Sequence, residues 1–263
     1  MPELVASASL PVLAALIAAF FGFFTLAGLG LGFAAERSFP RRKVMDVAPR
    51  AGQARHEIVG NAVFVGVTVT TFTAALWGGW ARFGEPTALA TAATFMALVL
   101  GFQVFYWFLH RAMHTKALLW MHRWHHESQV TSALSGQSVS LAEAAAWMLG
   151  YVGLPVAMSH VVPISFWGWA GYMAFNVFGN VFGHANVELS GKASGTRLVS
   201  ALANPWVYHA LHHARWTGHY GFQAALMDRI FGTEYADWPA LFTKILRGSP
   251  MKSLKERGDA ASS

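Results

Sequence analysis

The sequence predicts an all-α, polytopic membrane protein with about four to five transmembrane helices and a histidine-rich helical cap at one membrane face. Hydrophobic residues make up 54% of the 263 residues and charged residues only 12%, which is more apolar than an average soluble domain. The apolar residues gather in long runs, most of them without charge. Most of the 12 histidines lie in short clusters at helical spacing.

Five apolar runs predict the membrane segments, because a helix of about 20 apolar residues crosses the hydrocarbon layer. The runs are 10–34, 58–80, 87–109, 138–159 and 165–183. The first three qualify by length, and the last two, the former interrupted by Glu143, favour a membrane hairpin over 138–183. The chain starts with Met-Pro-Glu-Leu, where a signal peptide would carry positive charge, so we interpret the first run as a retained anchor.

The distribution of basic residues predicts the orientation. If the first run enters from outside, all of the 19 Lys and Arg except Arg82 lie on the cytoplasmic side. The net charge of +6 therefore indicates a cytoplasmic membrane face and not a nucleic-acid partner. A composition rich in Ala, Gly and Arg favours a bacterial inner membrane.

The chain divides into three regions by this pattern. Residues 1–100 form an N-terminal transmembrane region, in which 87–109 leads toward the histidines. Residues 101–235 carry the histidine clusters and include the hairpin 138–183. Residues 236–263 form a polar cytoplasmic tail.

The clustered histidines have spacings that place imidazoles on one face of a helix. The chain reads H-x-x-x-H from His110, and H-x-x-H-H from both His122 and His209. Residues three or four apart lie one helical turn apart. The predicted topology brings these clusters and His184 to the same membrane face. The nine candidate metal ligands are His110, His114, His122, His125, His126, His184, His209, His212 and His213.

The number and kind of ligands indicate two metal ions. A single ion takes about four to six ligands, and nine imidazoles exceed that number. The chain has no cysteine, which excludes thiolate haem, iron–sulfur clusters and cysteinyl zinc sites. A nitrogen-rich pair with open positions suits iron that binds O₂. His56 in the basic loop and His160 at the opposite face are not expected to be ligands.

Carboxylates near the clusters could orient the imidazoles by hydrogen bonds. The candidates are Glu127, Glu143, Glu188 and Asp228. A plain surface position is an equally good interpretation for Glu127 and the favoured one for Glu143.

Six stretches of the chain, in order, match those of one known family. They are His110–His114, His122–His126, Phe182–Val187, Pro205–His213, Tyr220–Gly221 and Asp228–Thr233. By these stretches the sequence resembles the fatty acid hydroxylase/sterol desaturase superfamily of integral-membrane di-iron enzymes, over about half the chain, from Phe102 to Tyr235.

Two positions depart from the family pattern. His219 stands where the family often has Asn, and it is a further ligand, a supporting residue or a neutral substitution. Glu188 stands where some members have another histidine. The candidates to support the ligands from behind are Glu188, His219, Asp228 and Asn186.

The resemblance implies two Fe²⁺ ions and O₂ as co-substrate. It also implies hydroxylation of an unactivated C–H bond in the acyl chain of a fatty acid or polar membrane lipid. The two electrons per turnover come from a separate ferredoxin or cytochrome with its reductase. The exposed basic residues Arg111, Lys116 and Arg123 could receive this donor, and contact with anionic lipid is an equal alternative.

Other functions fit the sequence less well. A sterol or carotenoid desaturase or hydroxylase on the same site is the main enzymatic alternative. A histidine-rich metal transporter would place its ligands at the bilayer midplane among acids, whereas these clusters lie beyond the ends of the apolar runs. A bis-histidine cytochrome would pair single histidines inside the spans.

Overall fold

The computed structural model describes residues 3–258, which fold into helices joined by turns and loops. The last five residues of the predicted tail lie outside the described residues. The helices of the first two thirds of the chain are α1 (Glu3–Ala6), α2 (Leu10–Ser38), η1 (Pro40–Arg42), α3 (Gln53–Trp77), α4 (Ala88–Met113), α5 (Leu119–His126), η2 (Ala133–Gln137), α6 (Leu141–Met148), η3 (Leu149–Gly153), α7 (Leu154–Val161) and α8 (Phe166–Gly183). Those that follow are η4 (Lys192–Gly195), α9 (Arg197–Leu202), α10 (Trp206–Arg215), α11 (Leu226–Ile230) and α12 (Trp238–Leu246).

The prediction of an all-α membrane protein with a histidine-rich end is confirmed. Among residues 3–258, four helical segments are long and apolar enough to cross a membrane. They are Leu10–Ser38, Gln53–Trp77, Ala88–Met113 and Leu141–Val161. The last of these joins α6, η3 and α7. Helix α8, from the fifth apolar run, is not among these four segments and packs mainly on α2 and α4.

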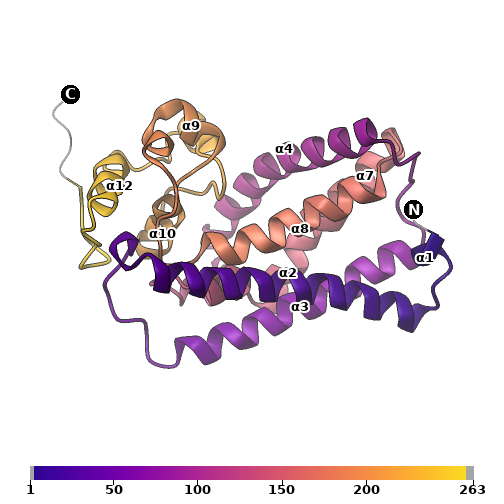
Figure 1. Ribbon diagram of the computed structural model, residues 1–263, viewed down its shortest axis with the longest axis horizontal. Helices are drawn as coiled ribbons and strands as arrows, with labels where there is room; N and C mark the ends of the chain where they lie inside the picture. Colours follow the sequence, from indigo (N-terminus) through magenta and orange to yellow (C-terminus); the bar gives the residue numbers. More distant parts are fainter. Residues whose placement is uncertain (1–2, 259–263) are drawn as a thin grey trace.

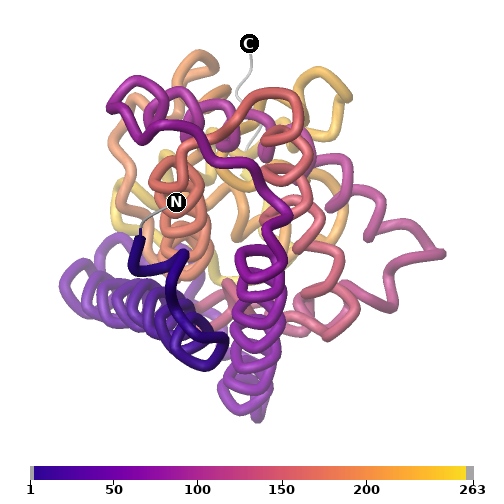
Figure 2. The backbone as a smooth tube through the Cα atoms, turned by 90° about the vertical axis from the view of Figure 1, so that its right-hand side faces the viewer, coloured from indigo at the N-terminus to yellow at the C-terminus, as the bar shows by residue number. Residues whose placement is uncertain are grey.

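The long helices lie along one axis and the later helices gather at one end. Helices α2, α3, α4 and α8 run along the long axis of the molecule, and α9, α10 and α12 form the cap at the end opposite the N-terminus (Figure 1). Figure 2 looks along this axis from the N-terminal end, with the yellow C-terminal segments in the distance. The histidine clusters lie where the bundle meets the cap.

Small residues let α2 approach its neighbours closely, as in other membrane bundles. A Cβ atom on Gly28 would lie 3.0 Å from the Val181 side chain of α8. A Cβ atom on Gly32 would lie 2.7 Å from Ala133 Cβ of η2. The close approach brings the C-terminal end of α8 and the η2 loop together, next to the histidines.

A π-helical turn, η3, interrupts the segment between α6 and α7. Its carbonyls are not left unpaired in the bundle. The Tyr172 hydroxyl donates to Gly150 O (3.1 Å) and the Trp169 indole donates to Tyr151 O (3.0 Å), both from α8. Such partners are required where backbone leaves the regular helical pattern at membrane depth. The turn sets Tyr151 against Phe102 of α4, with ring centroids 4.9 Å apart.

A buried carboxylate joins α3 to the loop that follows α5. Glu57 is 2% exposed, and it accepts hydrogen bonds from Gln53 Nε2, Ser132 Oγ and Ser135 Oγ. Helix α3 therefore begins at Gln53, before the apolar run at 58, because its polar first turn packs against protein. The sequence did not indicate this role for Glu57.

Candidate metal centre

The structure brings all nine candidate histidines together in two groups. The five-histidine group consists of His110, His114, His122, His126 and His212. The four-histidine group consists of His125, His184, His209 and His213. Within each group the potential ligand atoms lie within 4.8 Å of one another. Each group could therefore hold one metal ion.

Helical spacing assigns neighbouring histidines to different groups. On α5, His122 and His126 are four residues apart and join the five-histidine group, whereas His125 points to the other group. On α10 the arrangement is reversed. His209 and His213, again four apart, join the four-histidine group, and His212 points to the other. Each of the two H-x-x-H-H clusters thus supplies ligands to both groups.

Hydrogen bonds fix the ring orientation of six of the nine histidines. In each, Nδ1 lies within hydrogen-bond distance of an oxygen. The pairs are His110 with Tyr220 O, His122 with Glu143 Oε1, His125 with Ser138 O, His184 with Asn180 O, His212 with Gly218 O and His213 with Ser128 O. A carbonyl or carboxylate can only accept, so Nδ1 carries the proton and Nε2 of the neutral ring presents a lone pair.

These lone pairs converge in a way that suits a cation. The Nε2 atoms of His110 and His122 lie 3.0 Å apart, although the Nδ1 atom of each ring is already the donor. The buried Nε2 of His213 has no hydrogen-bond partner among residues 3–258. Unpaired buried acceptors are costly, and a bound metal ion would satisfy them. The donor set therefore fits a pair of nitrogen-ligated metal ions.

Burial keeps the imidazoles neutral. Desolvation lowers the pKa of His125 to about 4, partly offset by its hydrogen bond to Ser138 O, and lowers the pKa of His184 to about 3. Desolvation, reinforced by neighbouring histidines, lowers the pKa of His114 to about 2. Metal ligands must be unprotonated, so these rings are ready to bind at neutral pH.

Glu143 differs from the sequence-based interpretation, which favoured a surface acid. Its side chain is 1% exposed, and its Oε1 accepts from His122 Nδ1 at 2.6 Å and from the Trp147 indole at 3.1 Å. The histidine and the indole both bond to Oε1 of this buried acid, whereas its Oε2 has no hydrogen-bond partner among the described residues. Glu127, by contrast, lies partly exposed and pairs with Arg50 (2.6 Å).

Asp228 supports His110 indirectly, through the backbone of Tyr220. The buried carboxylate accepts five hydrogen bonds, two of them from the backbone amides of Tyr220 and Gly221 at 2.8 Å. The other donors are Trp107, Tyr208 and Thr233. Tyr220 O in turn accepts from His110 Nδ1 at 2.7 Å. Asp228 thereby holds the carbonyl that orients a candidate ligand.

The remaining three candidate supports do not contact the nine histidines through hydrogen bonds. Glu188 accepts from Val207 N (2.9 Å) at the start of α10 and from Ser190. Asn186 pairs with both backbone groups of Met45. His219 is buried outside both groups, and its ring stacks on Tyr208 at 3.5 Å. These residues hold the cap that carries the ligands.

The family model for fatty acid hydroxylase matches residues 95–233, more than half of the chain. The chain belongs to the fatty acid hydroxylase family. The resemblance inferred from the motifs is thereby confirmed, and with it membership of a family of membrane enzymes that modify lipids.

The relatives of this fatty acid hydroxylase family member include plant proteins. It is 30% identical over 160 residues to the very-long-chain aldehyde decarbonylase CER1 of Arabidopsis thaliana. It is 31% identical over 134 residues to Protein CER1-like 2 of the same plant, and 27% identical over 154 residues to the very-long-chain aldehyde decarbonylase GL1-4 of Oryza sativa subsp. indica. These alignments cover 59%, 49% and 56% of this chain, but only 24%, 22% and 24% of the relatives. No solved structure matches the chain.

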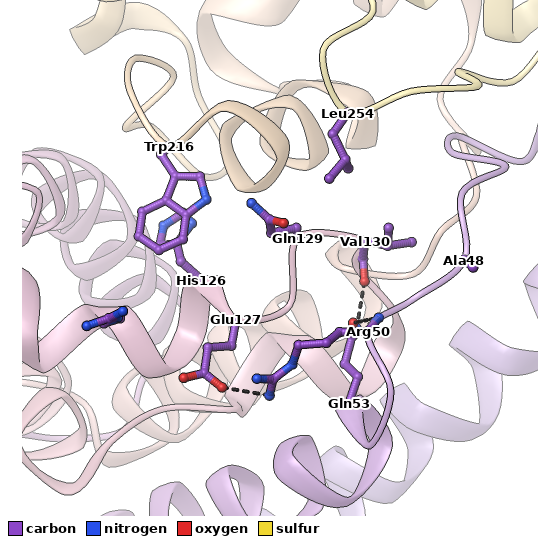
Figure 3. A pocket seen from close by; sticks show the side chains of 10 residues that line it. Ala48, Arg50, Gln53, His126, Glu127, Gln129, Val130, Trp216 and Leu254 are labelled. Atoms are coloured by element: carbon purple, nitrogen blue, oxygen red, sulfur yellow. Dashed lines mark hydrogen bonds and ion pairs between the residues drawn. The ribbon is translucent and has the colours of Figure 1, made fainter.

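Histidines of the two groups line two separate cavities in this family member. The first, here called the bundle cavity, measures about 20 Å³ and is lined by Phe64, Tyr106, His122, His125, Gly136, Val139, Glu143, Trp147, Tyr151, Asn180 and His184. The second, here called the cap pocket, measures about 430 Å³ and is lined by Ala48, Arg50, Gln53, Arg123, His126, Glu127, Gln129, Val130, Trp216 and Leu254 (Figure 3). Aromatic and apolar side chains make up much of the lining of the bundle cavity, whereas six of the ten residues that line the cap pocket are polar or charged.

Proposed function

We propose that the protein is a membrane-bound di-iron oxygenase that uses O₂ and two external electrons to hydroxylate an unactivated C–H bond in the acyl chain of a membrane lipid. The observation that carries this proposal is the pair of buried histidine groups, three of whose members line a bundle cavity that aromatic rings also line. The family match and the neutral state of the imidazoles support it.

The nine histidines would hold the two ions. When bound, iron would supply the O₂ binding and electron storage that oxidation of a C–H bond requires. The overall reaction is RH + O₂ + 2e⁻ + 2H⁺ → ROH + H₂O. Glu143 holds His122 in position, and Tyr220 O, itself held by Asp228, holds His110. The rings of Tyr106, Trp147 and Tyr151 exclude water and would receive an apolar chain.

The orientation follows from the same sequence pattern. The excess of basic residues on the side of the histidines supports a cytoplasmic position for the metal centre. Composition favours a bacterial inner membrane, although the relatives described above are plant proteins. We assign residues 1–100 to membrane anchoring, 101–235 to catalysis and 236–263 to a tail on the cap side.

A long-chain aldehyde is a second candidate substrate, because two of the relatives are named very-long-chain aldehyde decarbonylases. A sterol or carotenoid on the same di-iron site is the third. The bundle cavity measures only about 20 Å³, so any of these substrates must displace side chains on entry. Lipid analysis of cells with and without the protein distinguishes an alcohol, an alkene, a shortened hydrocarbon and an oxidised ring product.

The test combines metal analysis with two ligand variants. The purified chain should contain about two Fe per chain, as two groups of four and five nitrogens require. His125→Ala and His212→Ala should each abolish product formation while the protein still inserts into membranes. His160→Ala is the matched control, because His160 lies in α7 and bonds only to Trp80 O among the described residues. Full activity of either ligand variant would refute the di-iron assignment, and zinc alone without O₂ use would favour a transporter.

A further inference from the structure

The cap pocket shares no lining residue with the bundle cavity, and the lipid reaction proposed above does not use it. Its wall combines charged and amide side chains with one indole and one imidazole (Figure 3). The imidazole belongs to His126, a member of the five-histidine group. The pocket therefore reaches the metal centre from the cap.

A single aromatic contact connects the pocket to the metal ligands. The Trp216 ring packs on the His126 ring with centroids 4.7 Å apart and planes 36° apart. His126 Nε2 lies 3.0 Å from His212 Nε2 and 3.2 Å from His114 Nε2. His126 is fully buried, whereas Trp216 is partly exposed. An electron that reaches the indole is thus directly beside a candidate ligand.

The backbone of Trp216 is strained in a way that places this ring. Trp216 caps the C-terminus of α10 with φ 69°, a left-handed conformation usually taken there by glycine. Its amide donates to His212 O at 2.7 Å. Strain of this kind is tolerated where surrounding structure enforces it, and it is concentrated at functional sites. Here it sets the indole over His126 at the pocket wall.

Charge indicates the kind of partner. Arg50 and Arg123 are exposed at the pocket, and Glu127, the one acid in its lining, is bound to Arg50 at 2.6 Å. The rim thus carries net positive charge, which attracts an acidic surface. Of the other basic residues expected to receive a donor, Arg111 lies over Trp107 at 5.0 Å, turned toward an aromatic surface.

We propose that an acidic one-electron carrier protein docks over the cap pocket and that its electrons enter through the Trp216 indole and His126. This inference rests on the proposed function. Two carrier molecules are each oxidised by one electron, and the two electrons reach the metal centre. The electrons are then consumed with O₂ and two protons in the reaction written above. The carrier and the lipid thereby reach the metal centre through different cavities.

Docking is tested first, on the full chain in detergent and without any activity measurement. The probe is an acidic plant-type [2Fe–2S] ferredoxin, and the measurement is surface plasmon resonance at several salt concentrations. Arg50→Glu/Arg123→Glu should weaken binding at least about tenfold. The matched control is Lys192→Glu/Arg197→Glu, which makes the same charge change at two exposed cap positions. Equal weakening in both double variants, or no salt-sensitive binding to the unaltered chain, overturns the docking site.

Electron entry is tested next, on the iron-loaded protein by stopped-flow absorbance. Reduction by the ferredoxin should slow at least about tenfold in Trp216→Leu and stay within about threefold of the original rate in Trp216→Phe. Reduction by dithionite should be equally fast in all three proteins, because dithionite does not use the docking site of the carrier. Ferredoxin reduction of Trp216→Leu at the original rate overturns the relay while iron content still supports the di-iron assignment. Absence of iron from the unaltered chain would instead refute the proposed function.

Discussion

The two histidine groups share α5 and α10 but face different surroundings. The four-histidine group is buried throughout, and His125 and His184 of this group line the aromatic bundle cavity. The five-histidine group includes His114, which is only partly buried, and His126, which lines the polar cap pocket. His122 of the larger group reaches the bundle cavity as well.

The comparison indicates a division of roles within one cluster. A metal ion with four nitrogen ligands keeps more open positions than an ion with five. The group with fewer ligands is also the one with two members at the bundle cavity. We therefore infer that the four-histidine group handles O₂ and substrate, and that the five-histidine group receives electrons from the cap side.

Removal of one ligand from each group tests this division of roles most directly. His184→Ala leaves three nitrogens in its group, and we expect loss of one of the two ions and of all product. His114→Ala leaves four nitrogens in its group, so both ions should be retained with weaker affinity. Metal content measured by mass spectrometry after dialysis checks both variants. Equal metal loss in the two would contradict the assignment of unequal groups.

The hydrogen bond from His122 to Glu143 allows the metal affinity of the five-histidine group to be changed by itself. Glu143→Gln weakens the orientation of one ligand, and loss of such a partner typically lowers metal affinity about 10–100-fold. The effect should be confined to the ion of the five-histidine group. Metal titration of the apo-protein measures it, with Glu127→Gln as control because Glu127 binds Arg50 instead. An identical shift in the control would argue against this role of Glu143.

Substitution of Asp228, which supports His110 of the same group, should change the stability of the protein. Asp228→Asn removes the charge that accepts five buried hydrogen bonds, and we expect the free energy of unfolding to fall by about 2 kcal/mol. The thermal midpoint of the detergent-solubilised protein should fall accordingly. Glu85→Gln, at an exposed turn position, should leave the midpoint unchanged. An unchanged midpoint in Asp228→Asn would show that the carboxylate does not organise the Tyr220 segment.

Gly136→Ala is the corresponding change on the side of the four-histidine group. A Cβ atom at Gly136 would lie 2.3 Å from Asn180 O, the oxygen that accepts from His184 Nδ1. The backbone must move, at a cost of about 1–2 kcal/mol. We expect a lower thermal midpoint together with weaker binding of one metal ion. Gly30→Ala is the control, since its Cβ atom would meet no atom within 4 Å.

The sequence was sufficient for the features that depend on local periodicity. Spacings of three and four residues predicted that the histidines of each cluster share one face of a helix, but not that each cluster is divided between two groups. Apolar runs predicted the long helices, although α3 extends further toward its N-terminus than its run. Both kinds of pattern repeat within one or two helical turns, so they can be read without knowledge of the fold.

Long-range partners could not be predicted in the same way. Glu143 meets His122 across 21 residues, and Glu57 meets Ser135 across 78 residues. A lone acid in a sequence carries no sign of such a partner. His219 illustrates the same limit at short range. The sequence left it open among a further ligand, a supporting residue and a neutral substitution, whereas the structure places it in neither group, with a φ of 52° and its Nδ1 at the Tyr208 carbonyl.

The distribution of the ligands along the chain has a consequence for folding. An ion that binds both His114 and His212 closes a loop of 98 residues. A cross-link over a loop of this length removes chain entropy worth about 4–5 kcal/mol in the unfolded state. Metal binding would thus stabilise the fold at a late stage of folding, after the membrane segments have inserted and α10 has been synthesised. Limited proteolysis should cut the cap of the metal-free protein faster than that of the loaded protein.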